Sequence, residues 1–275
     1  MKTSRLIGRY RRPFIFTLLL VLLDAGLLVL FPLFIGRAID GAMTENYQGA
    51  IHLGFLGLAT LLIGALRRFF DSRFYARVYE QLGARIGDQE DSSVSTKSAH
   101  LGFLTEVVEF FENTLPELIN NSIGLVGTLV ILATLNPSVF VGCLLVSLVI
   151  MIIYGFSAKG IDALNQGYNE ELERQVSVIS EYQPIFLRNH LKKLMRWNIR
   201  LSDRETLNFS IIWLFMMSFL VLSIVFSIRQ GITEVGVVFS LVLYLFQFIE
   251  SAAVMPVFYQ EWLRFRGIIG RLAAI

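Results

Sequence analysis

Two carboxylic acids lie inside long apolar stretches of this 275-residue sequence, and they are the first candidates for chemistry. Asp24 lies in the stretch 13–35 and Glu250 in the stretch 235–254. An ionisable group within a membrane is costly, so by default it is a candidate for binding or carrying charge. No Lys, Arg or His lies at a similar depth, so we expect neither acid to have a basic partner. Two interpretations stay open: the acids remain protonated and hydrogen-bond within a helix bundle, or they take up protons or a cationic substrate.

A second set of candidates is a polar stripe in a third apolar stretch. Glu117, Asn121 and Thr128 recur there at helical spacing. Polar side chains on a membrane helix often hydrogen-bond to a neighbouring helix, which gives one interpretation. The other interpretation is that the stripe lines a cavity through which a small molecule passes.

The sequence offers little support for other chemistry. It has one cysteine and three widely separated histidines, and no spacing of Ser, His and Asp, or of Cys and His, that is typical of a catalytic or metal site. We therefore expect no catalytic residues, no metal and no cofactor. The basic run from Arg188 to Arg204 resembles a solvated or lipid-headgroup-facing helix surface, so we expect no nucleic-acid partner.

The elements that must position these residues are membrane helices. Hydrophobic residues make up 55% of the chain and charged residues only 17%, against about 25% charged residues in soluble domains. About 20 apolar residues span a bilayer as a helix. The sequence therefore predicts an all-α membrane protein with six transmembrane helices, at 13–35, 51–66, 116–135, 138–156, 209–228 and 235–254. A tight turn at Asn136-Pro137 should join the third to the fourth.

The basic residues predict the orientation of these helices. All of the 24 Lys and Arg residues except Arg37 and Arg229 lie in segments on one side, and basic loops stay in the cytoplasm. We expect both termini to be cytoplasmic, and the first apolar stretch to be a retained helix rather than a signal peptide. Compact loops and few cysteines favour a bacterial inner membrane.

The two cytoplasmic connections, 67–115 and 157–208, are polar but carry apolar residues at three-to-four spacing, which predicts two helical extensions beyond the membrane. The short second span should continue as a helix through Arg67. Pro184 should kink or interrupt its helix near Tyr182.

Several motifs occur in the order found in one family. Gly36-Arg37-Ala38-Ile39-Asp40 closes the first span, the segment 231–236 with Tyr244 opens the sixth, and Arg271-Leu272 lies near the C-terminus. Together they resemble the transmembrane domain of ABC exporters of the MsbA type. The resemblance implies one six-helix domain over 1–275 and a homodimer that exchanges two helices. It also implies alternating access for a small-molecule substrate within the lipid bilayer.

The motifs of a nucleotide-binding domain are not found in these 275 residues. A phosphate-binding loop needs a Gly-Lys pair, and the sequence contains none. The stretch that in the family contacts the ATPase is missing after Asp91. We therefore expect no enzyme activity in the chain, and transport of a small amphipathic or cationic molecule, with coupling to protons as one source of energy. A separate ATPase subunit, an ion channel on the same scaffold and a non-transporting scaffold remain alternatives.

Overall fold

The computed structural model describes residues 3–88, 93–180 and 184–273, and every element within these ranges is a helix. Six segments are long and apolar enough to cross a membrane, which confirms the predicted all-α fold with six spans. They are Arg11–Met43, Gln48–Gly87, His100–Leu135, Pro137–Ser180, Pro184–Arg229 and Val235–Val254.

Several helices are longer than the apolar stretches that predicted them. Helix α2 (Gln48–Gly87) continues through Arg67, as expected, and α5 (Pro137–Glu173) and α7 (Pro184–Arg229) also extend well beyond their apolar parts. Pro184 is the first residue of α7, where its missing N–H costs nothing. The kink expected near Tyr182 lies outside the described residues.

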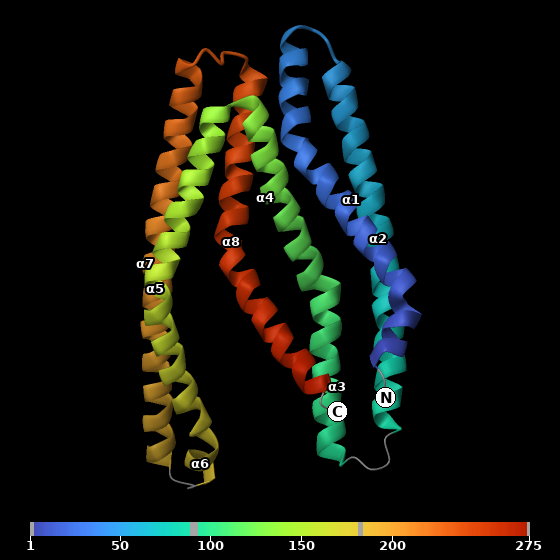
Figure 1. Ribbon diagram of the computed structural model, residues 1–275, viewed down its shortest axis with the longest axis vertical. Helices are drawn as coiled ribbons and strands as arrows, with labels where there is room; N and C mark the ends of the chain where they lie inside the picture. The colour runs from blue at the N-terminus through green and yellow to red at the C-terminus, as the bar shows by residue number, and fades with distance from the viewer. Residues whose placement is uncertain (1–2, 89–92, 181–183, 274–275) are drawn as a thin grey trace. The chain divides into compact units, whose positions relative to one another are not determined.

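The helices pack as two compact units, Met1–Pro137 with Ser227–Ile275 and Ser138–Phe226. Each is described by itself below. The first unit contains α1 (Thr3–Met43), α2, α3 (Val94–Glu109), the π-helical turn η1 (Phe110–Thr114), α4 (Leu115–Leu135) and α8 (Val235–Ala273), and the second contains most of α5 and α7, with α6 (Gln175–Ser180) between them (Figure 1).

In the first unit, α1 and α8 meet backbone to backbone through two glycines. A Cβ at Gly36 would collide with the Gly236 carbonyl, and a Cβ at Gly236 would collide with the Gly36 carbonyl and approach the Asp40 carboxylate. The Gly236 amide donates a hydrogen bond of 2.7 Å to Asp40 Oδ1. Since this amide lies in the first turn of α8, the carboxylate also complements the positive end of the helix dipole.

Two more hydrogen bonds continue this contact along the helices. Ser240 Oγ donates to the Pro32 carbonyl at 2.7 Å, and Tyr244 Oη donates to the Val29 carbonyl at 2.9 Å. Tyr244 is fully buried. Pro32 removes one backbone hydrogen bond within α1, a common cause of a bend. We call these contacts of Gly36, Asp40, Gly236, Ser240 and Tyr244 the α1–α8 clasp.

A buried asparagine organises the turn between α4 and α5. Asn136 Nδ2 donates to Ser227 Oγ at 3.0 Å and to Gln230 Oε1 at 3.1 Å. Gln230 and Gly231 directly follow the end of α7, and Gly231 has a φ of +92°, which glycine adopts without strain. The tight turn expected at Asn136-Pro137 is confirmed, since this one residue separates the two helices.

The second unit is an antiparallel pair of helices, α5 and α7 (Figure 1). The ring of Phe219 packs directly on the backbone at Gly142, where a Cβ would lie 2.5 Å from Cε2 of the ring. Asn208 Nδ2 donates a buried hydrogen bond of 2.6 Å to Ser157 Oγ. Ring-on-glycine packing and a paired buried amide fix how these two helices align.

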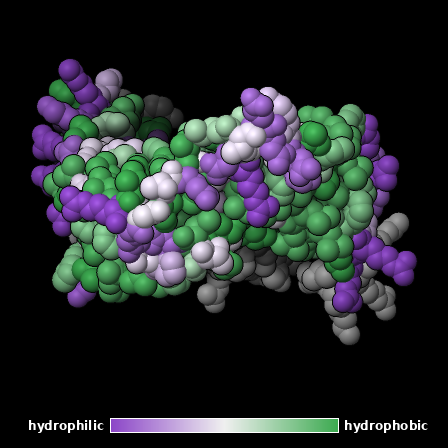
Figure 2. Space-filling model, turned by 90° about the horizontal axis from the view of Figure 1, so that it is seen from above, coloured by the Kyte–Doolittle hydropathy of each residue, from purple (hydrophilic) through white to green (hydrophobic). Residues whose placement is uncertain are grey.

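The surfaces of the helices are strongly apolar. Figure 2 shows apolar side chains over most of the visible face, with the hydrophilic ones gathered in separate groups. Along α2, Phe55 is 67% exposed and Leu61 66%. A patch of this kind on a soluble monomer would be unusual, whereas it is ordinary against lipid. The chain is a multi-pass membrane protein.

Candidate functional site

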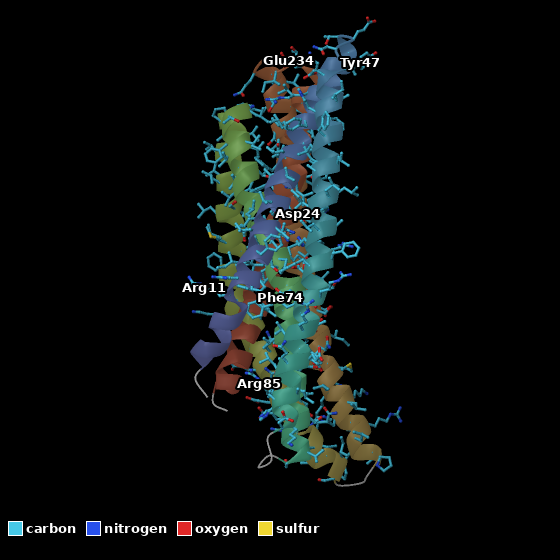
Figure 3. The ribbon with its side chains drawn as sticks, turned by 90° about the vertical axis from the view of Figure 1, so that its right-hand side faces the viewer. Arg11, Asp24, Tyr47, Phe74, Arg85 and Glu234 are labelled. Carbon is cyan, nitrogen blue, oxygen red and sulfur yellow. The ribbon has the colours of Figure 1, made fainter. Side chains whose placement is uncertain are left out.

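An ion pair joins α1 and α2 in the first unit. Arg67 Nη1 lies 2.9 Å from Asp24 Oδ2, and the two side chains are only 18% and 13% exposed. Asp24 lies well inside the length of the helical unit, between Tyr47 near one end and Arg85 near the other (Figure 3). The expectation that Asp24 has no basic partner is therefore wrong.

The depth of Arg67 explains the error. Asp24 lies 19 residues before Met43, the end of α1, and Arg67 lies 19 residues after Gln48, the start of α2. Because the two helices are antiparallel neighbours joined by a short turn, equal distances from that turn bring the two side chains to the same level. The predicted second span ends at residue 66, so Arg67 was not expected at the same depth as Asp24.

Arg67 serves a second carboxylate as well. Its Nε lies 3.7 Å from Asp71 Oδ2, one helical turn further along α2, and the Asp71 side chain is 7% exposed. This separation is an ion-pair contact and is too long for a hydrogen bond. One guanidinium is thus shared by two buried carboxylates, Asp24 at hydrogen-bond distance and Asp71 further away.

Two buried oxygen atoms beside this pair have no hydrogen-bond partner within the described part of the chain. They are Asp71 Oδ1 and Thr17 Oγ1. Thr17 belongs to α1, is 1% exposed, and lies close enough to Asp71 for their side chains to interact. A buried polar atom without a partner is costly, so such atoms often mark bound water, an ion or a proton that changes place.

A third acid and a tyrosine border the same group. Tyr75 is 4% exposed and its hydroxyl donates to the Phe111 carbonyl at 2.9 Å. Glu112 follows in the π-helical turn η1 and interacts electrostatically with Asp71 and Tyr75. We call Thr17, Asp24, Arg67, Asp71, Tyr75 and Glu112 the Arg67 cluster.

The π-helical turn that presents Glu112 has a local cause. Leu115 donates its amide to the Phe110 carbonyl five residues back. In that register the Phe111 carbonyl would accept from residue 116, which is proline and has no N–H. The Tyr75 hydroxyl donates to this carbonyl instead, so sequence and packing together hold α2 against η1.

The charges of the Arg67 cluster do not balance when its acids are ionised. Two carboxylates, of Asp24 and Asp71, lie against one guanidinium, and the carboxylate of Glu112 interacts electrostatically with Asp71. Desolvated charges need close compensation, so the arrangement favours a further positive charge or a proton. The carboxylates also lie on three elements, α1, α2 and η1, so a change in charge here acts on how these elements pack.

Of the predicted polar stripe Glu117, Asn121 and Thr128, only Thr128 is buried between helices. Thr128 is fully buried and its hydroxyl has no hydrogen-bond partner in the described ranges. One turn away, the backbone at Gly124 faces α8, with Gln247 Nε2 3.5 Å and Ser251 Oγ 3.6 Å from where its Cβ would lie. Asn121 instead donates to the Glu117 carbonyl within its own helix at 3.0 Å.

Two predicted residues lie apart from these contacts. Glu117 and Glu250 are exposed, and no hydrogen bond or ion pair between described residues connects either of them to Asp24. Of the five candidates, Asp24 is therefore in the Arg67 cluster and Thr128 is buried one turn from the contact of Gly124 with α8. No group of three or more His, Cys, Asp or Glu side chains in the described ranges could hold a metal ion.

Arg67, Asp71, Thr17 and Glu112 were not among the candidates from the sequence. Arg67 and Asp71 lie beyond the predicted end of the second span, in the predicted cytoplasmic extension, although their four-residue spacing is that of a helical ion pair. Thr17 carries no signal of its own, because isolated threonines in apolar helices are common.

Comparison with known proteins identifies one family. A family model described as "ABC transporter transmembrane region" matches residues 4–236, which include all of the Arg67 cluster and end at the first turn of α8. Comparison with the curated proteins gives no match.

Proposed function

Because the chain belongs to the family of ABC transporter transmembrane regions, we propose that it moves a small cationic or amphipathic molecule across a membrane by alternating access. Membership in the family and the six apolar helices support transport itself. The choice of a cationic group is supported by one observation, the excess of buried carboxylates over basic groups around Arg67.

The cluster suggests how a cation would be held and released. Arg67 is 2.9 Å from Asp24, so an incoming ammonium or a similar cation would compete with the guanidinium for that carboxylate. Arg67 can then move towards Asp71, which it already approaches to 3.7 Å. An exchange between two carboxylates on different helices couples the binding of a cation to the packing of α1 against α2.

The proposed assembly is a homodimer in which each chain contributes α5 and α7 to its partner. The separate packing of these helices in the second unit supports this arrangement, as does the family resemblance. Apolar side chains such as Phe156, which is 83% exposed, and Val176, which is 78% exposed, remain for such a contact. Both termini are proposed to lie in the cytoplasm of a bacterial inner membrane, on the basis of the basic residues.

The proposed energy source is an ion gradient rather than ATP bound by these 275 residues, which contain no Gly-Lys pair for a phosphate-binding loop. The gradient would act through the carboxylates of the Arg67 cluster. The alternative is a separate ATPase polypeptide that binds the same membrane domain.

The test is uptake of a lipophilic cation, tetraphenylphosphonium, into liposomes that contain the purified chain. An imposed pH or potential gradient without ATP should drive uptake above that of empty liposomes. Asp24→Asn should reduce uptake at least tenfold, while Asp88→Asn, an exposed acid just after α2, should leave it unchanged. Equal uptake by Asp24→Asn and the unmodified chain would contradict the role of the cluster.

The same preparation separates the alternatives. Uptake that appears only with ATP and a copurifying nucleotide-binding protein would identify the chain as the membrane part of a two-component ABC transporter. Single-channel current in a planar bilayer would identify a channel. Mass spectrometry of the intact particle measures whether two copies are present.

A further inference from the structure

The two carboxylates that share Arg67 are not equivalent. Asp24 lies at hydrogen-bond distance from the guanidinium, whereas Asp71 Oδ2 approaches Arg67 Nε only to 3.7 Å. Arg67 Nε and Asp71 Oδ1 are both buried without a hydrogen-bond partner in the described chain. The guanidinium therefore compensates the charge of Asp24 well and that of Asp71 poorly.

A second observation concerns the threonine beside Asp71. The hydroxyl of Thr17 is buried, has no hydrogen-bond partner in the described ranges, and lies beside Asp71 from the opposite helix. A threonine hydroxyl can accept as well as donate. Thr17 Oγ1 can accept from a protonated Asp71 and can donate to an ionised one, so it can pair with Asp71 in both states. The protonated state is favoured because Arg67 already pairs with Asp24 and a desolvated charge on Asp71 needs its own compensation.

The other groups around Asp71 cannot serve it in the same way. Tyr75 already donates its proton to the Phe111 carbonyl. Glu112, from η1, interacts electrostatically with Asp71 as a like charge, and Asp24, from α1, competes with Asp71 for Arg67. Arg67 is the only basic side chain that the structure places in contact with these acids within its described residues.

We propose that Asp71 is a proton-binding residue whose proton is shared with the Thr17 hydroxyl, and that Arg67 transfers from Asp24 to Asp71 when this proton leaves. The O–H bond of the Asp71 carboxyl group breaks, the proton passes to water, and the carboxylate that remains gains Arg67 as its counter-ion. Asp24 then loses its counter-ion and is open to a cation. This inference deepens the proposed function, on which it rests for the identity of the cation.

The test reads the protonated carboxyl group directly and needs no transported molecule. In infrared difference spectra of the purified chain in nanodiscs, taken between neutral and alkaline buffer so that ordinary carboxylates stay ionised throughout, a carboxyl group that is still protonated at neutral pH gives a carbonyl-stretch band. We expect such a band in the unmodified chain, its loss in Asp71→Asn, and its retention in Asp24→Asn. Thr17→Val should shift the band, because a carboxyl group that loses its hydrogen-bond acceptor absorbs at a different frequency.

Two controls keep the assignment falsifiable. Glu112→Gln should retain the band, and loss of the band in this variant but not in Asp71→Asn would overturn the proposal. Retention of an unchanged band in both Asp71→Asn and Thr17→Val would do the same. If Asp71→Asn does not fold, the carbonyl-stretch band is measured in Thr17→Val and Asp71→Glu instead. Glutamate keeps a titratable group, so Asp71→Glu should keep a band at a shifted position.

The outcome can be separated from that of the transport test. A band that depends on Asp71, in a chain that takes up no tetraphenylphosphonium, contradicts the proposed substrate class and supports the proton site. Uptake that depends on Asp24, with no band from Asp71, contradicts the proton site alone.

Discussion

Along α1, the polar groups that face α8 are hydrogen-bonded, whereas some of those that face α2 are not. In the α1–α8 clasp, Asp40 accepts from the Gly236 amide, and Ser240 and Tyr244 donate to α1 carbonyls. In the Arg67 cluster, the hydroxyl of Thr17 and Oδ1 of Asp71 make no such hydrogen bond to another described residue. The same helix therefore has one contact that is fully satisfied and one that is not.

This difference separates a fixed contact from one that can change. Satisfied hydrogen bonds to backbone atoms and a backbone approach at glycine allow little movement without loss of contacts. An arginine between two carboxylates can exchange one partner for the other at lower cost. Helix α1 is thus expected to stay with α8 and to alter its packing against α2.

The largest expected effect comes from removing the shared counter-ion. Arg67→Met leaves two buried carboxylates unpaired and should lower the free energy of unfolding by about 3–5 kcal/mol. The measurement is the midpoint of thermal unfolding in detergent, followed by circular dichroism. Arg68→Met, at the exposed neighbouring position, is the matched control and should change the midpoint little. Similar midpoints for both variants would mean that the ion pair contributes little to the packing of α1 on α2.

The next effect tests the clasp through its closest contact. A Cβ at Gly36 collides with the Gly236 backbone, so Gly36→Ala should cost about 1–3 kcal/mol of overpacking. Gly26 lies in the same helix with open space around it. Gly26→Ala should therefore stabilise the chain, by up to about 1 kcal/mol of helix propensity. The comparison fails if both substitutions change the unfolding midpoint in the same direction.

The smallest effects compare two buried hydroxyls. Ser240→Ala removes the hydrogen bond to the Pro32 carbonyl and should cost about 1 kcal/mol. Thr17→Val removes the hydroxyl that we pair with the Asp71 carboxyl group, and should cost a similar amount, about 1 kcal/mol, at a pH at which Asp71 is protonated. Both are measured as unfolding midpoints. A change of less than about 0.5 kcal/mol for Thr17→Val would contradict the proposed hydrogen bond to Asp71.

The helices and their turns could be predicted because their signals are local. Apolar length predicted the six spans, and Asn136-Pro137 predicted the turn between α4 and α5. The pairing of Asp24 with Arg67 depends instead on which residues of two helices lie at the same level. Equal distances from the turn between α1 and α2 contained that information, but only once the second helix was known to continue past residue 66.

The face on which a residue lies was harder to predict than its depth. Asp24 and Glu250 both lie in apolar stretches and were candidates for the same reason, yet one is held against a neighbouring helix and the other is exposed. Glu117 and Asn121 share a helical stripe with Thr128, but only Thr128 is buried. Helical spacing predicts which residues share a face of a helix. It does not predict whether that face packs on another helix or is exposed, because this depends on the tertiary packing.

The π-helical turn η1 also sets the rotational phase between α3 and α4. Compared with a continuous α-helix, such a turn accommodates one extra residue, which corresponds to a rotation of about 100° around the helix axis. If the same residues formed an uninterrupted α-helix instead, every side chain on one side of 110–114 would be turned by that angle relative to the other side. Glu112 and Thr128 could then no longer face their present neighbours together. The chain therefore encodes the alignment of two packed faces in a single additional residue.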